Sequence, residues 1–218
     1  MSTPTIAAQV SEFNLGFTAQ IGERLSDVFD REQAELDAAG VPATAVSVGD
    51  SVPNAALVDV NGAAADLYEE LGDGRSVVVF YRGAWCPYCN IVLKQYQAEL
   101  LPALRTRGVT LLAISPQTPE GSEKAVGGAS LEFTVLSDPS NKLIRQLGIV
   151  TEPTADARAA HTELGFDVAD SNADATGDIP FPTVLILDAN RVVSYADVHV
   201  NYTTRTEVAD ILAALDRD

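Results

Sequence analysis

The sequence predicts an α/β fold in which helices flank a mixed central sheet and a helical extension precedes it. Short apolar runs typical of buried strands alternate with stretches of helical spacing from about residue 48 onward. In residues 1–39 the apolar side chains recur only at helical spacing, and a glycine and a proline follow this segment. The 218 residues, 46% of them hydrophobic, can bury one α/β core. We therefore expect a helical extension over residues 1–45 and an α/β domain over residues 46–218.

The stretch from residue 76 to residue 94 joins a strand to a helix that begins at a Cys-x-x-Cys pair. Residues 77–81 form an apolar run, and Cys86 and Cys89 open a segment of helical spacing. The first turn of a helix has unpaired N–H groups and the positive end of the macrodipole, which favour a thiolate over a thiol. Arg82 either adds a cation here or is a solvated turn residue. This placement predicts a redox-active dithiol.

Three other roles are open to the pair, which holds both cysteines of the chain. A structural disulfide is disfavoured because so short a loop removes little entropy from the unfolded state. A zinc site would need His161 and His199, and no second closely spaced pair is present to complete it. Two inert core cysteines are the third alternative. A redox pair fits Cys-x-x-Cys beside a strand–helix–strand pattern best, and we expect no metal and no cofactor.

The charge of the chain bears on its partners and its location. A formal net charge of −17 argues against binding to nucleic acid or to an anionic membrane. The first ten residues lack the basic start and the apolar run of a signal peptide, and no apolar run approaches the length of a membrane span. We therefore expect a soluble, cytoplasmic protein in which a disulfide is transient rather than structural.

The N-terminal segment carries apolar side chains mostly at every third or fourth position, which predicts amphipathic helix over residues 1–39. Gly16 is expected to divide this helix into two pieces. The apolar stripe has two interpretations of equal weight. It packs on the sheet of its own chain, or it meets its copy in a homodimer.

The remaining elements continue the alternation of strands and helices. Strands are expected over residues 56–60, 77–81, 109–115, 131–136, 183–188 and 192–198. Helices are expected over residues 66–71, from the cysteine pair to Gly108 with a kink at Pro102, within residues 116–130, and over residues 141–147 and 204–215. A strand, a helix and a strand in succession imply parallel pairing with a right-handed crossover.

Residues 151–178 are rich in acidic side chains and have little apolar periodicity. They predict a surface insertion with one helix over residues 156–163. His161 lies in this helix, and we expect it to be solvated rather than catalytic.

Two motifs carry a resemblance to a known fold. Trp85-Cys86-Pro87-Tyr88-Cys89 follows an apolar strand, and Pro182-Thr183 precedes a later one. This arrangement resembles the thioredoxin fold, in which the proline before the threonine is cis and faces the cysteines. Further segments match the peroxiredoxin, or AhpC/TSA, branch of that fold, at residues 48–53, 79–83, 113–116, 136–139 and 187–188. The resemblance covers about residues 46–215 and implies reduction of hydroperoxides, with a thioredoxin-like or small-thiol reductant.

The active-site pattern departs from that of peroxiredoxins. The family carries Pro-x-x-x-Thr-x-x-Cys, in which the cysteine attacks peroxide while the threonine orients it and an arginine stabilises the thiolate. With Cys89 aligned to that cysteine, this chain has Arg82 at the proline and Cys86 at the threonine. Pro182 lies near the position of the arginine. The chain is therefore similar to peroxiredoxin-like proteins that carry a thioredoxin-style pair.

Two mechanisms follow, and they exchange the roles of the cysteines. In a peroxidase, Cys89 attacks the peroxide and Cys86 resolves the sulfenic acid. In a thioredoxin-like disulfide reductase, Cys86 attacks a substrate disulfide and Cys89 resolves the mixed disulfide. A non-catalytic, redox-sensing interaction module is the third alternative. Pro182 and Thr183 are expected beside the pair, whereas Trp85 either screens the thiols or packs in the core. The flanking segments favour the peroxidase.

Overall fold

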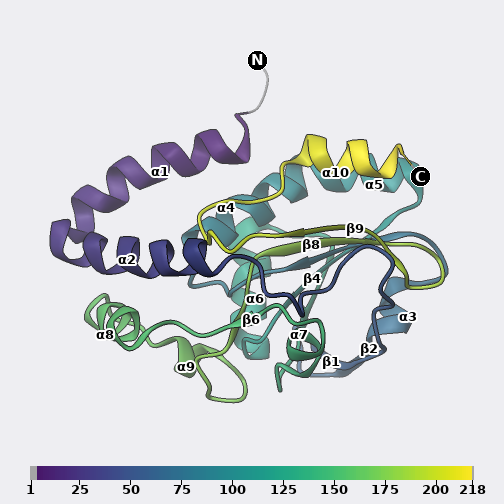
Figure 1. The fold of residues 1–218 in the computed structure, drawn as a ribbon. Helices are drawn as coiled ribbons and strands as arrows, with labels where there is room; N and C mark the ends of the chain where they lie inside the picture. The colour runs from purple at the N-terminus through teal and green to yellow at the C-terminus, as the bar shows by residue number, and fades with distance from the viewer. Residues whose placement is uncertain (1–3, 218) are drawn as a thin grey trace.

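The computed structural model describes residues 4–217 and has a mixed central sheet (Figure 1). Its strands are β1 (Ala56–Asp59), β2 (Ala64–Asp66), β3 (Ser76–Phe80), β4 (Thr110–Ser115), β5 (Thr134–Ser137), β8 (Thr183–Leu187) and β9 (Val193–Val198). They form one seven-stranded sheet in the order β2-β1-β5-β4-β3-β8-β9. Strand β4 runs parallel to both β3 and β5, and β8 runs antiparallel to β3. The predicted α/β class and the parallel pairing are confirmed.

Helices cover both faces of this sheet. They are α3 (Leu67–Leu71), α4 (Pro87–Gln95), α5 (Leu101–Arg107), α6 (Pro119–Ala129), α7 (Lys142–Gln146) and α10 (Val208–Leu215). Helices α4, α5 and α10 pack on the face that carries Val77 and Val79, and α3 and α7 pack on the face that carries Val78 and Phe80. Because successive side chains of a strand point to opposite faces, β3 is buried on both sides.

The predicted interruption of the long cysteine helix lies just before Pro102. A π-helical segment, η1 (Tyr96–Leu100), separates α4 from α5. Proline has no backbone N–H to donate within the helix, and the wider π turn is one way for a helix to accommodate such a break. No helix within residues 4–217 combines the length and the apolar character that crossing a bilayer requires.

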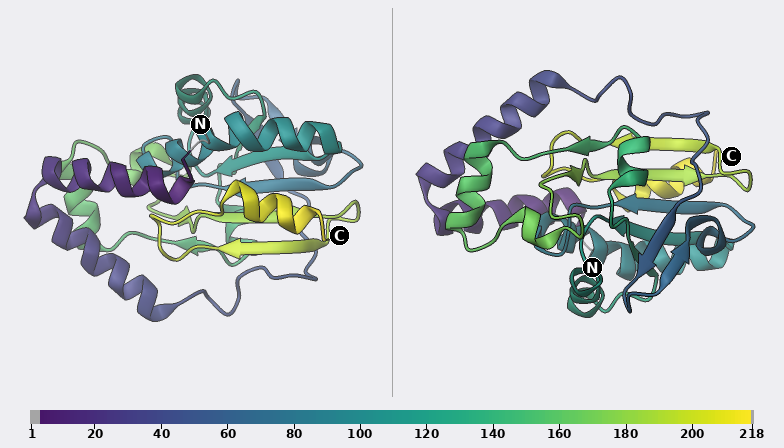
Figure 2. Two further views of the ribbon diagram at one scale, coloured as in Figure 1. Left: turned by 90° about the horizontal axis from the view of Figure 1, so that it is seen from above. Right: turned by 90° about the horizontal axis from the view of Figure 1, so that it is seen from below.

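Two N-terminal helices, α1 (Ile6–Ile21) and α2 (Glu23–Ala39), form a hairpin that extends past one end of the sheet (Figure 2). The helices separate at Gly22 and not at Gly16, so the sequence prediction was wrong on this point. Gly22 has a φ of +80°, which glycine adopts easily. Gly16 remains inside α1, since one glycine within a helix costs only about 1 kcal/mol.

The start of α1 is held on the α/β domain. Ile6 and Val10 are buried in the same hydrophobic cluster as α4 and α10. The carboxylate of Glu207, directly before α10, accepts hydrogen bonds from the backbone N–H groups of Ile6 and Ala7 at 3.0 and 2.8 Å. Leu15, farther along α1, is 80% exposed. Part of the apolar stripe therefore packs on its own chain.

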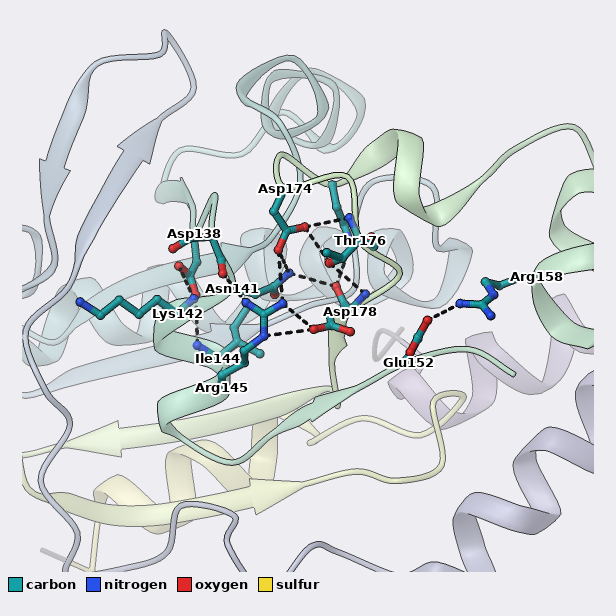
Figure 3. A network of polar contacts seen from close by, with 12 residues as sticks. Asp138, Asn141, Lys142, Ile144, Arg145, Glu152, Arg158, Asp174, Thr176 and Asp178 are labelled. Carbon is teal, nitrogen blue, oxygen red and sulfur yellow. Dashed lines mark hydrogen bonds and ion pairs between the residues drawn. The ribbon is translucent and has the colours of Figure 1, made fainter. Parts of the chain in front are cut away.

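The acidic insertion is folded against α7. It contains α8 (Ala155–Glu163) and α9 (Val168–Ser171), and its ends pair as β6 (Val150–Thr151) and β7 (Ile179–Pro180). Arg145 of α7 forms ion pairs with Asp174 at 3.4 Å and with Asp178 at 2.5 Å (Figure 3). Asn141 donates to the backbone carbonyl of Asp178 at 3.2 Å. The helix expected over residues 156–163 is confirmed, and these polar contacts anchor the loop that follows it.

Candidate active site

The two cysteines lie at the start of α4, directly beyond the end of β3. Cys86 is the N-cap residue, Pro87 begins the helix, and Cys89 lies in its first turn. The backbone N–H of Cys89 donates to the carbonyl of Cys86 at 3.1 Å. Both are free thiols with 0% exposed surface. The strand–turn–helix placement predicted for the pair is confirmed.

Arg205 contacts both thiols from the loop between β9 and α10. Its Nη2 atom lies 3.2 Å from the sulfur of Cys89 and 3.9 Å from that of Cys86. Its Nη1 atom donates to the carbonyls of Tyr202 and Thr204, both at 2.6 Å. The cation is therefore held in place beside Cys89. Sequence reasoning missed Arg205, which is 116 positions from Cys89 and belongs to no local motif.

The two buried thiols have opposite pKa shifts. Burial raises the pKa of Cys86 well above its ordinary value, and the neighbouring Cys89 raises it further. Burial also acts against ionisation of Cys89, but a hydrogen bond from Cys86 and the charge of Arg205 outweigh it. The pKa of Cys89 is thereby lowered well below its ordinary value. These directions favour ionisation of Cys89 over that of Cys86, so the helix start alone does not decide which thiol ionises.

This assignment predicts a pH dependence. We expect the reaction of the reduced protein with peroxide to proceed at a constant rate around neutral pH and to slow as the pH falls through the lowered pKa of Cys89, because protonation removes the nucleophile. Single-turnover rates and the ultraviolet absorbance of the thiolate, both measured against pH, test this. A midpoint near that of a free thiol, about 8.5, would contradict it.

Arg82 is buried between two aromatic rings. Its guanidinium carbon lies 4.9 Å from the ring centre of Trp85 and 4.6 Å from that of Tyr202, and the residue is 6% exposed. Of the two interpretations of Arg82, the solvated turn residue is therefore wrong. Its charge also lowers the pKa of Cys89, as a smaller contribution than that of Arg205.

Trp85 belongs to an aromatic cluster that includes the insertion. Its ring stacks on Phe166 at 5.4 Å and lies 5.8 Å from the ring of His161, which stacks on Phe29 at 5.2 Å. His161 is buried, so the expectation of a solvated side chain was wrong, because α8 packs against α2. Burial, and then the charge of Arg82, lower the pKa of His161 to about 4.

Pro182 and Thr183 lie where β8 begins, beside the end of β3. The peptide bonds of the described residues are all trans, which corrects the cis bond expected at Pro182; trans is the intrinsically favoured isomer. Pro182 and Arg205 line the same small void, and the carbonyl of Pro182 accepts from the N–H of His199 at 2.9 Å. The hydroxyl of Thr183 donates to the carbonyl of Phe181 at 2.8 Å, so it is engaged by its own backbone.

A cavity of about 700 Å³ lies between the N-terminal helices and the cysteine end of α4. Cys86 and Arg82 line it, whereas Cys89 does not. Eight of its 22 lining residues are aromatic: Phe13, Phe17, Phe29, Trp85, Tyr88, His161, Phe166 and Tyr202. A second hollow, of about 670 Å³ between α4 and α6, contains neither cysteine. Within residues 4–217, no three His, Cys, Asp or Glu side chains are grouped so as to hold a metal ion.

Comparisons with known proteins find relatives named as thiol-disulfide oxidoreductases and as peroxiredoxins. The thiol-disulfide oxidoreductase ResA of Geobacillus thermodenitrificans is 30% identical over 112 residues, which are 51% of this chain and 63% of ResA. Peroxiredoxin Bcp of Escherichia coli K12 is 30% identical over 104 residues, 48% of this chain and 65% of Bcp. This chain thus spans slightly less than two thirds of the length of either relative.

A solved structure shows the same fold. Reduced Prx3 of Vibrio vulnificus in complex with H2O2 superposes with a TM-score of 0.62 and 20% identity, covering 78% of this chain and 99% of that one. The model of the AhpC/TSA family matches residues 48–196, from the loop before β1 into β9, and so includes both cysteines. On that match, which covers more than half of the chain, the protein belongs to the AhpC/TSA family.

Proposed function

We propose that the protein reduces hydroperoxides through a dithiol–disulfide cycle in which Cys89 attacks and Cys86 resolves. The observation that carries this proposal is the guanidinium of Arg205 at 3.2 Å from the sulfur of Cys89. With its lowered pKa, Cys89 is the nucleophile available at neutral pH. Relatives named as peroxiredoxins and as thiol-disulfide oxidoreductases support this class of reaction.

The chemistry has two steps before an external reductant is needed. The Cys89 thiolate attacks the terminal peroxide oxygen, the O–O bond breaks, and the alkoxide or hydroxide takes up a proton, leaving a sulfenic acid. Cys86, on the same helical turn, then loses its proton and attacks the sulfenic sulfur, so that water leaves and a disulfide forms. Arg205 stabilises the thiolate at the start and faces the charge that develops at the reacting sulfur.

Substitution of each cysteine separates the two roles. We expect Cys89→Ser to abolish peroxide consumption by the pre-reduced protein, because the attacking thiolate is lost. Cys86→Ser should retain one rapid turnover and accumulate a sulfenic acid on Cys89. Stopped-flow mixing with hydrogen peroxide and with an organic hydroperoxide, followed by sulfenic-acid trapping, measures both. Reaction no faster than that of a free thiol of the same pKa would exclude the peroxidase.

The second candidate function is disulfide reduction with Cys86 as nucleophile. Cys86 lines the cavity, which favours contact between a substrate and this cysteine. Its raised pKa opposes the role, because attack requires a thiolate. If Cys89→Ser traps a mixed disulfide on Cys86 and Cys86→Ser stops the reaction with disulfides, this candidate replaces the peroxidase. A redox sensor would form the disulfide once and show no turnover.

Other expectations stay predictions from the sequence. They are an external thiol as reductant, a homodimer through α1 and α2, the division of the chain near residue 45, and a cytoplasmic location.

A further inference from the structure

We infer that the cavity beside Cys86 binds the reductant, and that this reductant is a low-molecular-weight thiol carrying a carboxylate. The thiol attacks Cys86 of the oxidised pair from within the cavity. This inference rests on the dithiol–disulfide cycle proposed above, and it assigns to the cavity the step that restores the dithiol.

Access to the cysteines favours a small thiol over a protein. Neither sulfur has exposed surface, and α1 lies across the start of α4. The hydroxyl of Tyr88 donates to the side chain of Asn14 at 2.8 Å, and the rings of Tyr88 and Phe13 meet edge to face at 5.4 Å. A protein reductant needs a disulfide at the surface, whereas a cavity of about 700 Å³ has the size of a small-molecule site.

Arg82 supplies the recognition of a carboxylate. It is 6% exposed and is the one Lys or Arg side chain in the cavity lining described here. The ion pairs found within residues 4–217 all involve other side chains, and the contacts of the Arg82 guanidinium are with two aromatic faces. Among the described residues no carboxylate forms an ion pair with this cation, and a carboxylate fits the fork of a guanidinium with two hydrogen bonds.

The acidic residues of the cavity lining further define the charge of the expected ligand. Glu32 is buried, lines the same cavity, and accepts a hydrogen bond from the backbone N–H of Thr154 at 2.7 Å. Asp30 also lines it. Negative groups in the same lining as Arg82 favour a ligand that carries an ammonium group besides its carboxylate. Among carboxylate thiols, one of the amino-acid type therefore matches the charges of the lining best.

The two pKa shifts select Cys86 as the sulfur that is attacked. When the reductant thiolate bonds to the Cys86 sulfur, the Cys86–Cys89 bond breaks and Cys89 leaves as a thiolate, the form that Arg205 stabilises. A thiol of lower pKa is the faster leaving group. A second reductant thiolate then attacks the reductant sulfur of the mixed disulfide, and Cys86 leaves and takes up a proton. Two thiols become one disulfide, and the dithiol is restored.

The test uses the full-length protein oxidised to the Cys86–Cys89 disulfide with diamide, so no peroxide is involved. The rate at which the disulfide is reduced is measured with 3-mercaptopropionate, 2-mercaptoethanol, cysteamine and cysteine. Each rate is divided by the rate at which the same thiol reduces hydroxyethyl disulfide, which corrects for differences in intrinsic reactivity. We expect the two carboxylate thiols to exceed 2-mercaptoethanol by roughly tenfold after this correction. Arg82→Gln should remove the preference, and Arg82→Lys should restore part of it. Arg105→Gln, which alters an exposed arginine paired with Glu132, should retain it.

The corrected rates of different thiols are compared on the same variant. An effect of Arg82 on the cysteine pKa values therefore cancels from their ratio. Equal corrected rates for all four thiols would overturn the inference, and so would a preference that persists in Arg82→Gln. Faster reduction by a thioredoxin with its reductase, at equal concentration, would also overturn it. Failure of the pre-reduced protein to consume peroxide would instead reject the proposed function and leave the thiol preference measurable.

Discussion

Replacing Arg205 with glutamine is expected to slow peroxide reduction by the pre-reduced protein about 100-fold at neutral pH. The substitution removes the cation whose Nη2 atom lies 3.2 Å from the sulfur of Cys89. Burial, which raises the pKa of Cys89, is then opposed by fewer groups, so that pKa rises and the thiolate fraction falls. Stopped-flow rates over a range of pH should show a lower rate at pH 7 and a midpoint shifted to higher pH.

Two further variants separate the charge from its geometry and from general effects. Arg205→Lys keeps the charge and should recover part of the rate. Arg105→Gln removes an exposed arginine that pairs with Glu132 and should leave both rate and pH profile unchanged. Thermal unfolding of each variant verifies that it is folded. A folded Arg205→Gln protein with the rate and pH profile of the parent would contradict the role given to Arg205.

Replacing Gly148 with alanine is expected to lower the free energy of unfolding by about 3 kcal/mol or more. Gly148 follows α7 with a φ of +66°, and a Cβ atom there would lie 2.1 Å from the carbonyl oxygen of Thr44. That contact is with backbone, which cannot rotate away as a side chain can. The backbone N–H of Val46 donates to the carbonyl of Leu147 at 2.8 Å, so a shift here also disturbs the segment that leads from α2 to the sheet. Urea unfolding measures the loss.

Gly108→Ala is the matched control for this change. Gly108 ends α5 with a φ of +64°, and a Cβ atom there would meet nothing within 4 Å. Only the backbone strain of a left-handed residue is added, which costs about 1 kcal/mol. Equal losses of stability for the two variants would show that the contact with Thr44 is not the cause.

The strands of the core could be predicted because their signal is local. The run at residues 77–81 is apolar without interruption, and β3 is buried on both faces. Predictions failed where a distant segment changes the environment of a residue. The last helix begins at Val208 rather than Thr204, because residues 199–207 form the loop that holds Arg205. His199 fixes this loop by hydrogen bonds to Thr204 at 2.7 Å and to Thr206 at 3.3 Å.

The candidate site shows the same contrast between features with a local sequence signal and features that depend on distant segments. Cys86 and Cys89 were found from their spacing and from the strand before them. The burial of His161 depends on α2 and α8, which are far apart in the chain, and no pattern within either helix signals it. Arg205 lies outside residues 48–196, the part of the chain that the family model matches, so motif comparison did not find it either.

The sequence alone determined the dithiol and its place at the start of a helix after a buried strand, because spacing and apolar periodicity within one short stretch decide both. Only the tertiary structure decided which cysteine has the lowered pKa and which lines the cavity. Burial raises the pKa of Cys89, whereas the hydrogen bond from Cys86 and the charge of Arg205 lower it. The hydrogen bond is local to the helix start, but burial and the charge of Arg205 depend on residues that the fold brings together from distant parts of the chain.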